Sequence, residues 1–221
     1  EGLEKQLATD PKNEQLYIQL IYGYSRINDM EKTLEFAEKL DEEIPQSDKA
    51  QLALYKIYLD NDDLEKGMES MKRVFESDKL ETVSKTEVLK DFLQTSKTNE
   101  ALQPLVTQAI EDYSANVEDV EAYKVLAAYF QQEKQLDAAL KFYELGMELN
   151  DQDFDLIKKT ALLYLDTGAF AKAEQLSTAA LESYPAQPLL YLINGAALNQ
   201  LGDAKKAVVQ LDTGLSYLLD E

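Results

Sequence analysis

The stretch YLDTGAFAKAEQLSTAALESYP, from Tyr164 to Pro185, sets an aromatic residue, a glycine turn, two small residues and a closing proline at fixed distances. The pattern returns 34 residues later, where a second glycine turn stands at Gly202. Earlier copies have their turns near Asn28, Asp62 and Lys134. A motif that recurs at a constant period of this length indicates an array of small repeated units rather than a single hairpin.

The repeat starts implied by this pattern lie at Glu14, Asp48, Thr82, Val120, Phe154 and Pro188. Their spacing is 34 residues except for one step of 38. We therefore expect six repeats, preceded by a leading segment, at 1–13, 14–47, 48–81, 82–119, 120–153, 154–187 and 188–221. The leading segment reads as the second helix of a truncated preceding repeat, because Pro11 occupies the place of a closing proline.

Each repeat has the pattern of a helical hairpin. Apolar residues recur with helical spacing, as at Tyr17, Leu20, Ile21 and Tyr24, and a short polar or glycine turn separates two such segments. Small residues in the second segment, such as Ala173, allow two helices to approach closely. One hairpin cannot bury its own apolar face, so neighbouring hairpins must stack into a continuous core.

These columns resemble those of the tetratricopeptide repeat family across essentially the whole chain. The matching positions are the bulky residues Tyr17, Tyr123, Ile157 and Tyr191, the leucines Leu20, Leu54 and Leu126, the small residues Ala127, Ala161 and Gly195, and the prolines Pro11, Pro45 and Pro185. Gln51 and Lys85 depart from the bulky column in the second and third repeats. The resemblance implies an all-α, right-handed α-solenoid of antiparallel helix hairpins whose first helices line a groove for proteins or peptides.

The composition narrows the function. The net charge is −20, from 42 acidic and 22 basic residues, and such a surface repels nucleic acid and anionic lipid. Cysteine, histidine and tryptophan are absent, which excludes disulfides, zinc sites of the Cys/His type and histidine-based catalysis. No apolar run is long enough to span a membrane. We expect no enzyme activity, no cofactor and no metal, and slightly favour the bacterial cell envelope over the cytoplasm.

Two acidic motifs are interpreted as solvated turns. The run DQDFD at Asp151–Asp155 begins like a calcium loop, but Leu156 and Leu162 stand where that loop needs a glycine and a bidentate glutamate. The run DNDD at 60–63 suits a turn and a helix N-cap. The third repeat is irregular: Pro104 falls inside its expected second helix and should bend it. Four extra residues near DYSANVED are either a tolerated insertion or a bend between two half-arrays.

The predicted groove collects the outward positions of the first helices. It comprises Ile18, Tyr22, Arg26, Lys49, Leu52, Lys56, Leu59, Lys90, Leu93, Lys124, Lys158, Leu162, Leu165, Leu189 and Leu192. The lysines either occur there by chance, as solubilising residues, or attract an acidic peptide with apolar anchors. A carboxylate clamp of the kind some family members use would need asparagines where this chain has Tyr22, Ala53 and Glu87.

We therefore predict a scaffold or adaptor that binds a peptide or partner domain in this groove. One alternative is a self-assembling array, because Leu211, Leu215, Leu218 and Leu219 continue an apolar pattern to the last residues, where a solenoid normally carries a polar cap. Such an array would form a homo-oligomer through its ends. Another alternative is a regulatory segment of a larger protein, of which this chain is a fragment.

Overall fold

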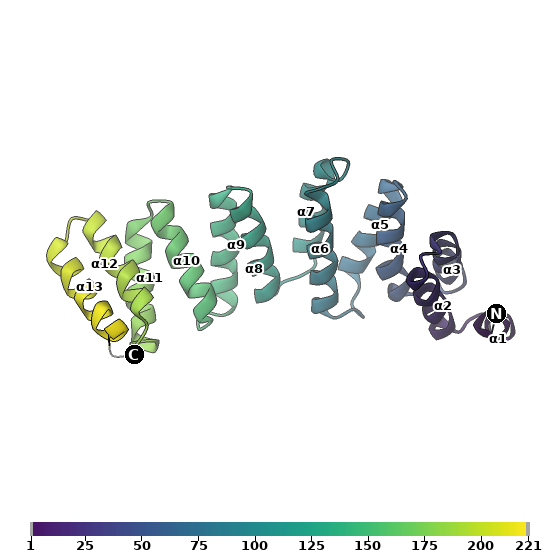
Figure 1. Cartoon of the computed structure of the whole chain (residues 1–221), viewed down its shortest axis with the longest axis horizontal. Helices are drawn as coiled ribbons and strands as arrows, with labels where there is room; N and C mark the ends of the chain where they lie inside the picture. The colour runs from purple at the N-terminus through teal and green to yellow at the C-terminus, as the bar shows by residue number, and fades with distance from the viewer. Residues whose placement is uncertain (1, 220–221) are drawn as a thin grey trace. The chain divides into compact units, whose positions relative to one another are not determined.

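The computed structural model describes residues 2–219, and these residues form an all-α protein (Figure 1). Within them there are thirteen α-helices, one short 3-10 helix and no strand. Glu1, Asp220 and Glu221 lie outside the described residues, and so do those parts of the expected segments 1–13 and 188–221. The helices group into two compact units, Glu1–Val117 and Glu118–Glu221. The boundary between the units falls within DYSANVED, at 112–119, where the sequence predicts either an insertion or a bend.

The N-terminal unit consists of one leading helix and three helix pairs. Its elements are α1 (Gly2–Thr9), α2 (Glu14–Arg26), α3 (Met30–Glu43), α4 (Asp48–Asp60), α5 (Leu64–Glu76), α6 (Thr82–Ser96), η1 (Gln103–Leu105) and α7 (Val106–Ser114). Helix α2 pairs with α3, α4 with α5 and α6 with α7, while α3 packs on α4 and α5 on α7. Each pair therefore also contacts the next, as a stack of hairpins requires.

The C-terminal unit consists of three regular hairpins. They are formed by α8 (Val120–Gln132) with α9 (Leu136–Leu149), α10 (Phe154–Asp166) with α11 (Phe170–Ser183), and α12 (Pro188–Gln200) with α13 (Ala204–Leu219). Hairpins of this length at a 34-residue spacing have the tetratricopeptide-like fold that the sequence columns predict. We propose that the starts of the first helices mark the starts of the repeats.

The turn inside each regular hairpin has a characteristic backbone conformation. In each of these turns one residue adopts a positive φ. The angle is near 60° at Asn28, Asp62 and Lys134, and it is 76° at Gly168 and 88° at Gly202. These residues share one place in the repeat, the second position after the first helix ends. In three turns the next residue is an aspartate whose carboxylate accepts a hydrogen bond from a backbone amide of the second helix, at Asp29, Asp63 and Asp203.

Small residues let the paired helices pack closely. A methyl group added at Gly214 in α13 would lie 2.7 Å from the Cβ of Tyr191 in α12. At Gly146 in α9, an added methyl would lie 3.0 Å from a terminal carbon of Leu156, on the first helix of the next hairpin. Small residues therefore serve both contacts of the second helix, the one inside its own hairpin and the one with its neighbour.

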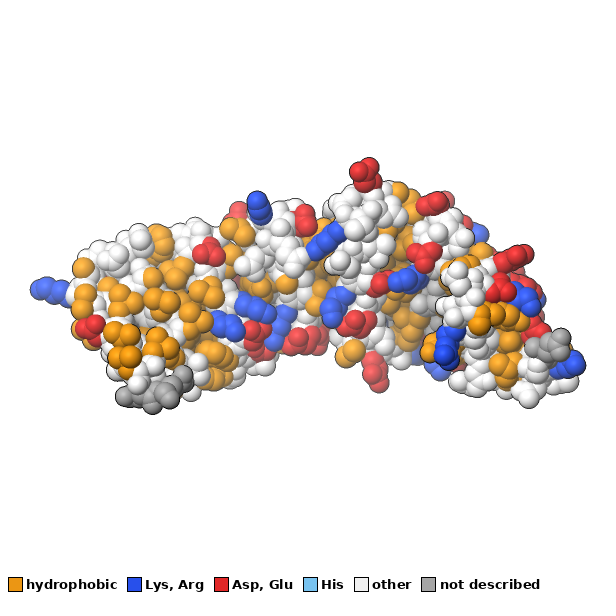
Figure 2. Space-filling model, viewed as in Figure 1, with side chains coloured by type: hydrophobic (Ala, Val, Ile, Leu, Met, Phe, Trp, Pro, Cys, Tyr) orange, Lys and Arg blue, Asp and Glu red, His pale blue; other side chains and the backbone are white. Residues whose placement is uncertain are grey.

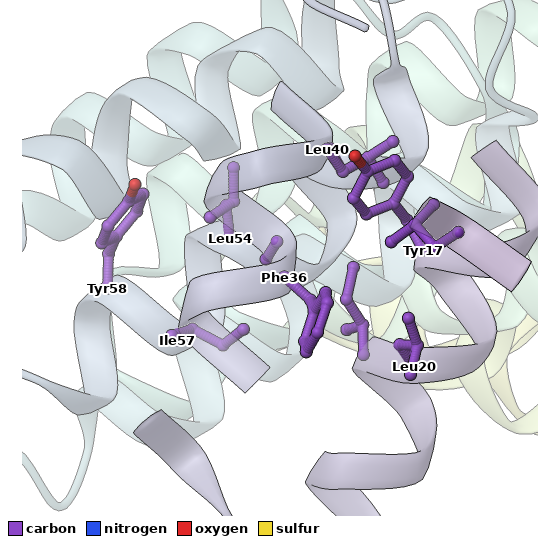
Figure 3. Packing of buried hydrophobic residues seen from close by; sticks show 11 residues of the cluster. Tyr17, Leu20, Phe36, Leu40, Leu54, Ile57 and Tyr58 are labelled. Atoms are coloured by element: carbon purple, nitrogen blue, oxygen red, sulfur yellow. The ribbon is translucent and has the colours of Figure 1, made fainter. Parts of the chain in front are cut away.

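Buried side chains from three successive helices form one core cluster of the N-terminal unit. Tyr17 and Leu20 from α2 pack with Phe36 and Leu40 from α3 and with Leu54 from α4 (Figure 3). The apolar faces of two hairpins are thereby joined into one cluster. This interlocking is why a single hairpin would not fold alone.

The two polar residues that replace the bulky column are buried and satisfied. Gln51 is 1% exposed, and its side-chain amide donates to Asp41 of α3 at 2.6 Å. Lys85 is 8% exposed, and its ammonium donates to the carbonyl oxygen of Phe75 at 2.8 Å. Each side chain reaches back to the preceding second helix, so hydrogen bonds there replace the apolar contact made elsewhere.

The expectation that Pro104 bends the second helix of the third repeat is wrong. Pro104 lies in the 3-10 turn Gln103–Leu105, and the α-helix begins after it, at Val106. Proline is tolerated in a first turn because its missing amide has no intrahelical acceptor there. The consequence is a second helix of nine residues rather than a bent one.

Candidate partner-binding surface

The predicted groove residues of α2 lie on one face of that helix. Ile18, Tyr22 and Arg26 are four residues apart, so their side chains follow one another along the helix. Ile18 is half-buried, whereas Tyr22 is 65% exposed, which is unusual for an aromatic side chain. The Arg26 guanidinium lies 5.8 Å from the centre of the Tyr22 ring, within the range of a cation–π contact.

The face continues on α4 and α6 with basic and apolar side chains. Leu52 is partly buried, and Lys49, Lys56 and Lys90 are exposed. The lysines have carboxylate neighbours: Lys49 lies 3.6 Å from Glu14, Lys56 lies 2.8 Å from Asp91, and Lys90 lies 2.8 Å from Glu87. Two of these ion pairs join neighbouring first helices, α2 to α4 and α4 to α6. We call this set from α2, α4 and α6 the N-terminal first-helix surface.

Two leucines predicted for the groove lie in the core instead. Leu59 is 7% exposed and Leu93 is 4% exposed. Leu59 packs against Gly67 in the second helix of its own hairpin, where an added methyl would lie 2.5 Å from the leucine. Because they are buried, these two residues cannot contact a partner, and the candidate surface does not include them.

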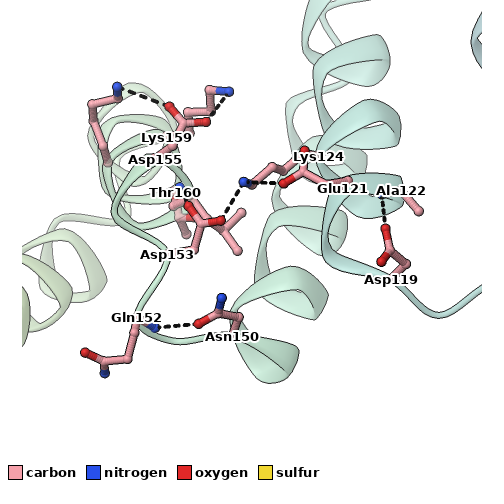
Figure 4. Close-up of polar contacts among 12 residues, drawn as sticks. Asp119, Glu121, Ala122, Lys124, Asn150, Gln152, Asp153, Asp155, Lys159 and Thr160 are labelled. Carbon is pink, nitrogen blue, oxygen red and sulfur yellow. Dashed lines mark hydrogen bonds and ion pairs between the residues drawn. The ribbon is translucent and has the colours of Figure 1, made fainter. Parts of the chain in front are cut away.

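In the C-terminal unit, Lys124 on α8 is held by two carboxylates. Its ammonium lies 2.5 Å from Asp153 and 2.8 Å from Glu121 (Figure 4). Desolvation opposes the ionisation of Asp153, but hydrogen bonds from Lys124 and the Leu156 amide outweigh it, and the pKa of Asp153 falls below its usual value. Desolvation likewise opposes the charge on Lys124, yet the two carboxylates raise the pKa of Lys124 above its usual value.

The remaining predicted residues of this unit form a lysine–aspartate pair and a group of leucines. Lys158 on α10 lies 3.1 Å from Asp155. Leu162 on α10 and Leu192 on α12 are 37% and 54% exposed, and Leu165 and Leu189 are partly buried. All five predicted groove lysines thus have a carboxylate neighbour, so the line of basic residues is neutralised within the chain.

The leucines near the end of the chain are exposed, as their pattern predicts. Leu211, Leu215, Leu218 and Leu219 of α13 are 38%, 53%, 58% and 76% exposed. Three of them line a hollow of about 470 Å³ together with residues of α12. We call this lining the end surface: Pro188, Leu189, Leu192, Leu211, Gly214, Leu215 and Leu218.

Sequence reasoning missed a recurring polar cluster between hairpins. The Tyr164 hydroxyl donates to Glu144 at 2.7 Å, and Lys172 lies 2.8 Å from the same carboxylate and 5.2 Å from the Tyr164 ring centre. Hydrogen bonds from Lys172 and Tyr164 lower the pKa of Glu144. The cluster lies in a hollow between α9, α10 and α11.

The same cluster occurs earlier in the chain, where Tyr24 donates to Glu4 and Tyr58 to Glu38. A lysine lies over each of these rings as well, at Lys32 and Lys66. The cluster has a signal in the sequence: a glutamate stands 20 residues before the tyrosine, and a lysine stands eight residues after it. Because tyrosine and glutamate belong to successive hairpins, this cluster ties hairpins together.

The acidic runs lie where a turn meets a helix, and Asp63 and Asp153 are the N-caps of α5 and α10. Asp153 caps α10 by accepting the Leu156 amide at 3.0 Å, and Asp155 pairs with Lys158 and Lys159. Among residues 2–219, no group of three or more acidic side chains is arranged to hold a metal ion. Over the same residues, every helix is too short or too polar to cross a membrane.

Comparison with known proteins shows similarity of structure only. No protein-family model matches the chain, and no curated protein matches its sequence. The structure of YrrB, described as a TPR protein with an unusual peptide-binding site, is 15% identical, with a TM-score of 0.48, and the match covers 100% of this chain and 94% of that one. The structure of MamA is 18% identical, with a TM-score of 0.44, covering 92% of this chain and 91% of that one. At these scores the likeness carries no inference about what this chain binds.

Proposed function

We propose that this chain is a protein-binding scaffold that holds a peptide against its N-terminal first-helix surface. The observation that supports this most is the exposure of Tyr22, at 65%, beside Arg26. Tyrosine and arginine are the residue types most enriched at the energetic centres of protein interfaces. Partly buried Ile18 and Leu52 supply apolar contact area on the same surface.

The charges of this surface favour a peptide with an acidic residue near an apolar anchor. Arg26 forms no ion pair with any residue that the structure describes, so its guanidinium is available to a carboxylate. The side chains of Lys56 and Asp91 are 51% and 39% exposed. Ion pairs exposed to this extent contribute only about 0–1 kcal/mol to stability. A peptide carboxylate can therefore replace Asp91 as the partner of Lys56 at little cost. A basic peptide on this surface would bring its positive charges beside Arg26 and Lys56, and this juxtaposition of like charges is unfavourable.

Selection of peptides from a random display library against the full chain tests the proposal. We expect the selected peptides to combine an acidic residue with an aromatic or aliphatic one. Tyr22→Ala should weaken their binding about tenfold or more, measured by isothermal titration calorimetry. Arg26→Gln should weaken it less, and more strongly at low than at high salt.

Two control variants match these changes on other surfaces. Val209→Ala removes an exposed apolar side chain from α13, and Lys72→Gln removes an exposed charge from the second helix α5. Neither should change peptide affinity. Peptides that bind Tyr22→Ala as tightly as the unchanged chain, or that lose affinity on Val209→Ala, would overturn the assignment of this surface.

A further inference from the structure

The end surface differs in charge from the rest of the molecule. The thirteen residues of α12 include no charged side chain. Helix α13 carries Lys205, Lys206 and Asp212 among its described residues, against a net charge of −20 for the chain. Figure 2 shows hydrophobic side chains gathered over α12 and α13. The residues that line the end surface itself are all uncharged and apolar.

A comparison with the two preceding hairpins shows what has changed on the first helix. Leu189 and Leu192 occupy two positions of the repeat that form ion pairs in α10 and α8. Those pairs are Asp155 with Lys158 at 3.1 Å and Glu121 with Lys124 at 2.8 Å. The last hairpin thus has leucines, one of them 54% exposed, where its neighbours have charges. Solubility alone would favour charged residues over leucines at exposed positions. The leucines therefore indicate a face that becomes covered by another molecule or segment.

The second helices show the same difference. Ser177 on α11 is buried by α12, and the Asn194 amide donates to its hydroxyl at 3.0 Å. The equivalent residue on α13 is Leu211, which packs on Gly195 of α12 and is otherwise 38% exposed. A covering helix would therefore meet an apolar side chain at this position of α13, where α11 offers a hydroxyl. An apolar, uncharged side chain is the best-matched contact for the occupant at this position.

We propose that the occupant is a second copy of the same surface, so that two chains form a symmetric dimer through α12 and α13. Two molecules that each carry a net charge of −20 repel one another, and least where both surfaces are uncharged. A two-fold interface requires only that the patch be complementary to itself, which apolar leucines around a hollow satisfy. The face of α1 does not fit as an alternative, because its exposed side chains include the polar Lys5 and Gln6.

This proposal is independent of the proposed peptide site, which lies in the other compact unit. Sedimentation equilibrium over a wide range of concentration tests it directly. We expect the unchanged chain to reach twice the monomer mass as the concentration rises. Leu192→Lys and Leu215→Lys should each raise the dimer dissociation constant about tenfold or more. Both side chains are more than half exposed, so the fold is retained and circular dichroism verifies it.

Val83→Lys and Ile27→Lys are matched controls, because these apolar side chains are 69% and 70% exposed in the N-terminal unit. Neither should alter the dimer. A chain that stays monomeric at every concentration would overturn the proposal and leave the end surface to a partner of another sequence. A dimer that persists in Leu215→Lys and dissociates in Val83→Lys would overturn it as well.

Hydrogen–deuterium exchange tests the symmetry of the contact. On raising the concentration, we expect slower exchange in α12 and α13 only. Additional protection of α1 would indicate head-to-tail association and contradict the two-fold dimer. Peptide binding by the monomeric Leu215→Lys variant would show that the scaffold function and the dimer are separate.

Discussion

Replacing Lys124 by methionine should destabilise the chain far more than the same change at Lys158. The two lysines occupy equivalent positions in consecutive hairpins. The Lys124 side chain is 14% exposed and that of its partner Asp153 is 19% exposed, at 2.5 Å. Lys158 is 35% exposed, and its partner Asp155 is 44% exposed, at 3.1 Å. The two lysines thus have the same position in the repeat, but the ion pair of Lys124 is more buried than that of Lys158.

The expected magnitude follows from this burial. Removing one partner of a fully buried ion pair costs about 3–5 kcal/mol, whereas an exposed pair contributes about 0–1 kcal/mol. The Lys124 pair lies between these limits, so we expect Lys124→Met to lower the free energy of unfolding by about 2 kcal/mol. Lys158→Met should cost about 0.5 kcal/mol. Asp153→Ala should cost about 1 kcal/mol more than Asp153→Asn, because alanine cannot cap α10.

Urea unfolding followed by far-ultraviolet circular dichroism measures these differences. The double variant Lys124→Met/Asp153→Asn should cost less than the sum of the single changes, since both remove the same interaction. If Lys124→Met is no more destabilising than Lys158→Met, the reasoning from burial is refuted. Additive costs in the double variant would refute the pairing itself.

Three further predictions use the same unfolding assay. Gly214→Ala should destabilise the chain by about 1–3 kcal/mol, because the added methyl would lie 2.7 Å from the Cβ of Tyr191. Gly23→Ala should instead stabilise it by about 1 kcal/mol, because no such neighbour lies within 4 Å of that methyl. Lys134→Gly should stabilise by about 1 kcal/mol, since its φ is 59°, and Gly168→Ala, at a φ of 76°, should destabilise by a similar amount. The lowered pKa of Asp153 gives stability that is present above the unfolded value of about 3.9 and lost as the pH falls through the lower folded value. The unchanged chain should therefore lose more stability than Asp153→Asn on acidification; opposite signs in any of these three comparisons would contradict the corresponding contact.

The repeated fold was predictable because local rules act identically in each copy. The turn after each first helix needs a residue that tolerates a positive φ, and Asn28, Gly168 and Gly202 satisfy this requirement visibly in the sequence. The apolar spacing of Tyr17 and Leu20 likewise identifies a buried face. Pro104 was misjudged because proline weakens a helix interior but suits a first turn, and the sequence alone did not show which place it would take.

The candidate surface was less predictable, because it depends on contacts between hairpins. Periodicity places Lys56 on the outward face, but its carboxylate partner Asp91 belongs to the next first helix, 35 residues later. Leu59 has the same outward projection, yet the lack of a side chain at Gly67 opens space that buries it. Neighbouring helices determine which ion pairs form and how deeply a side chain is buried. A projection of one helix alone does not include these neighbours.

The most direct test of the scaffold proposal is hydrogen–deuterium exchange of the full chain with and without a selected peptide. We predict slower exchange in α2 and α4, which carry Tyr22 and Lys56, and unchanged exchange in the second helices α3 and α5. Protection confined to α3 and α5, or no protection of α2 at a saturating peptide concentration, would contradict the proposal that the first helices of the N-terminal unit form the binding surface.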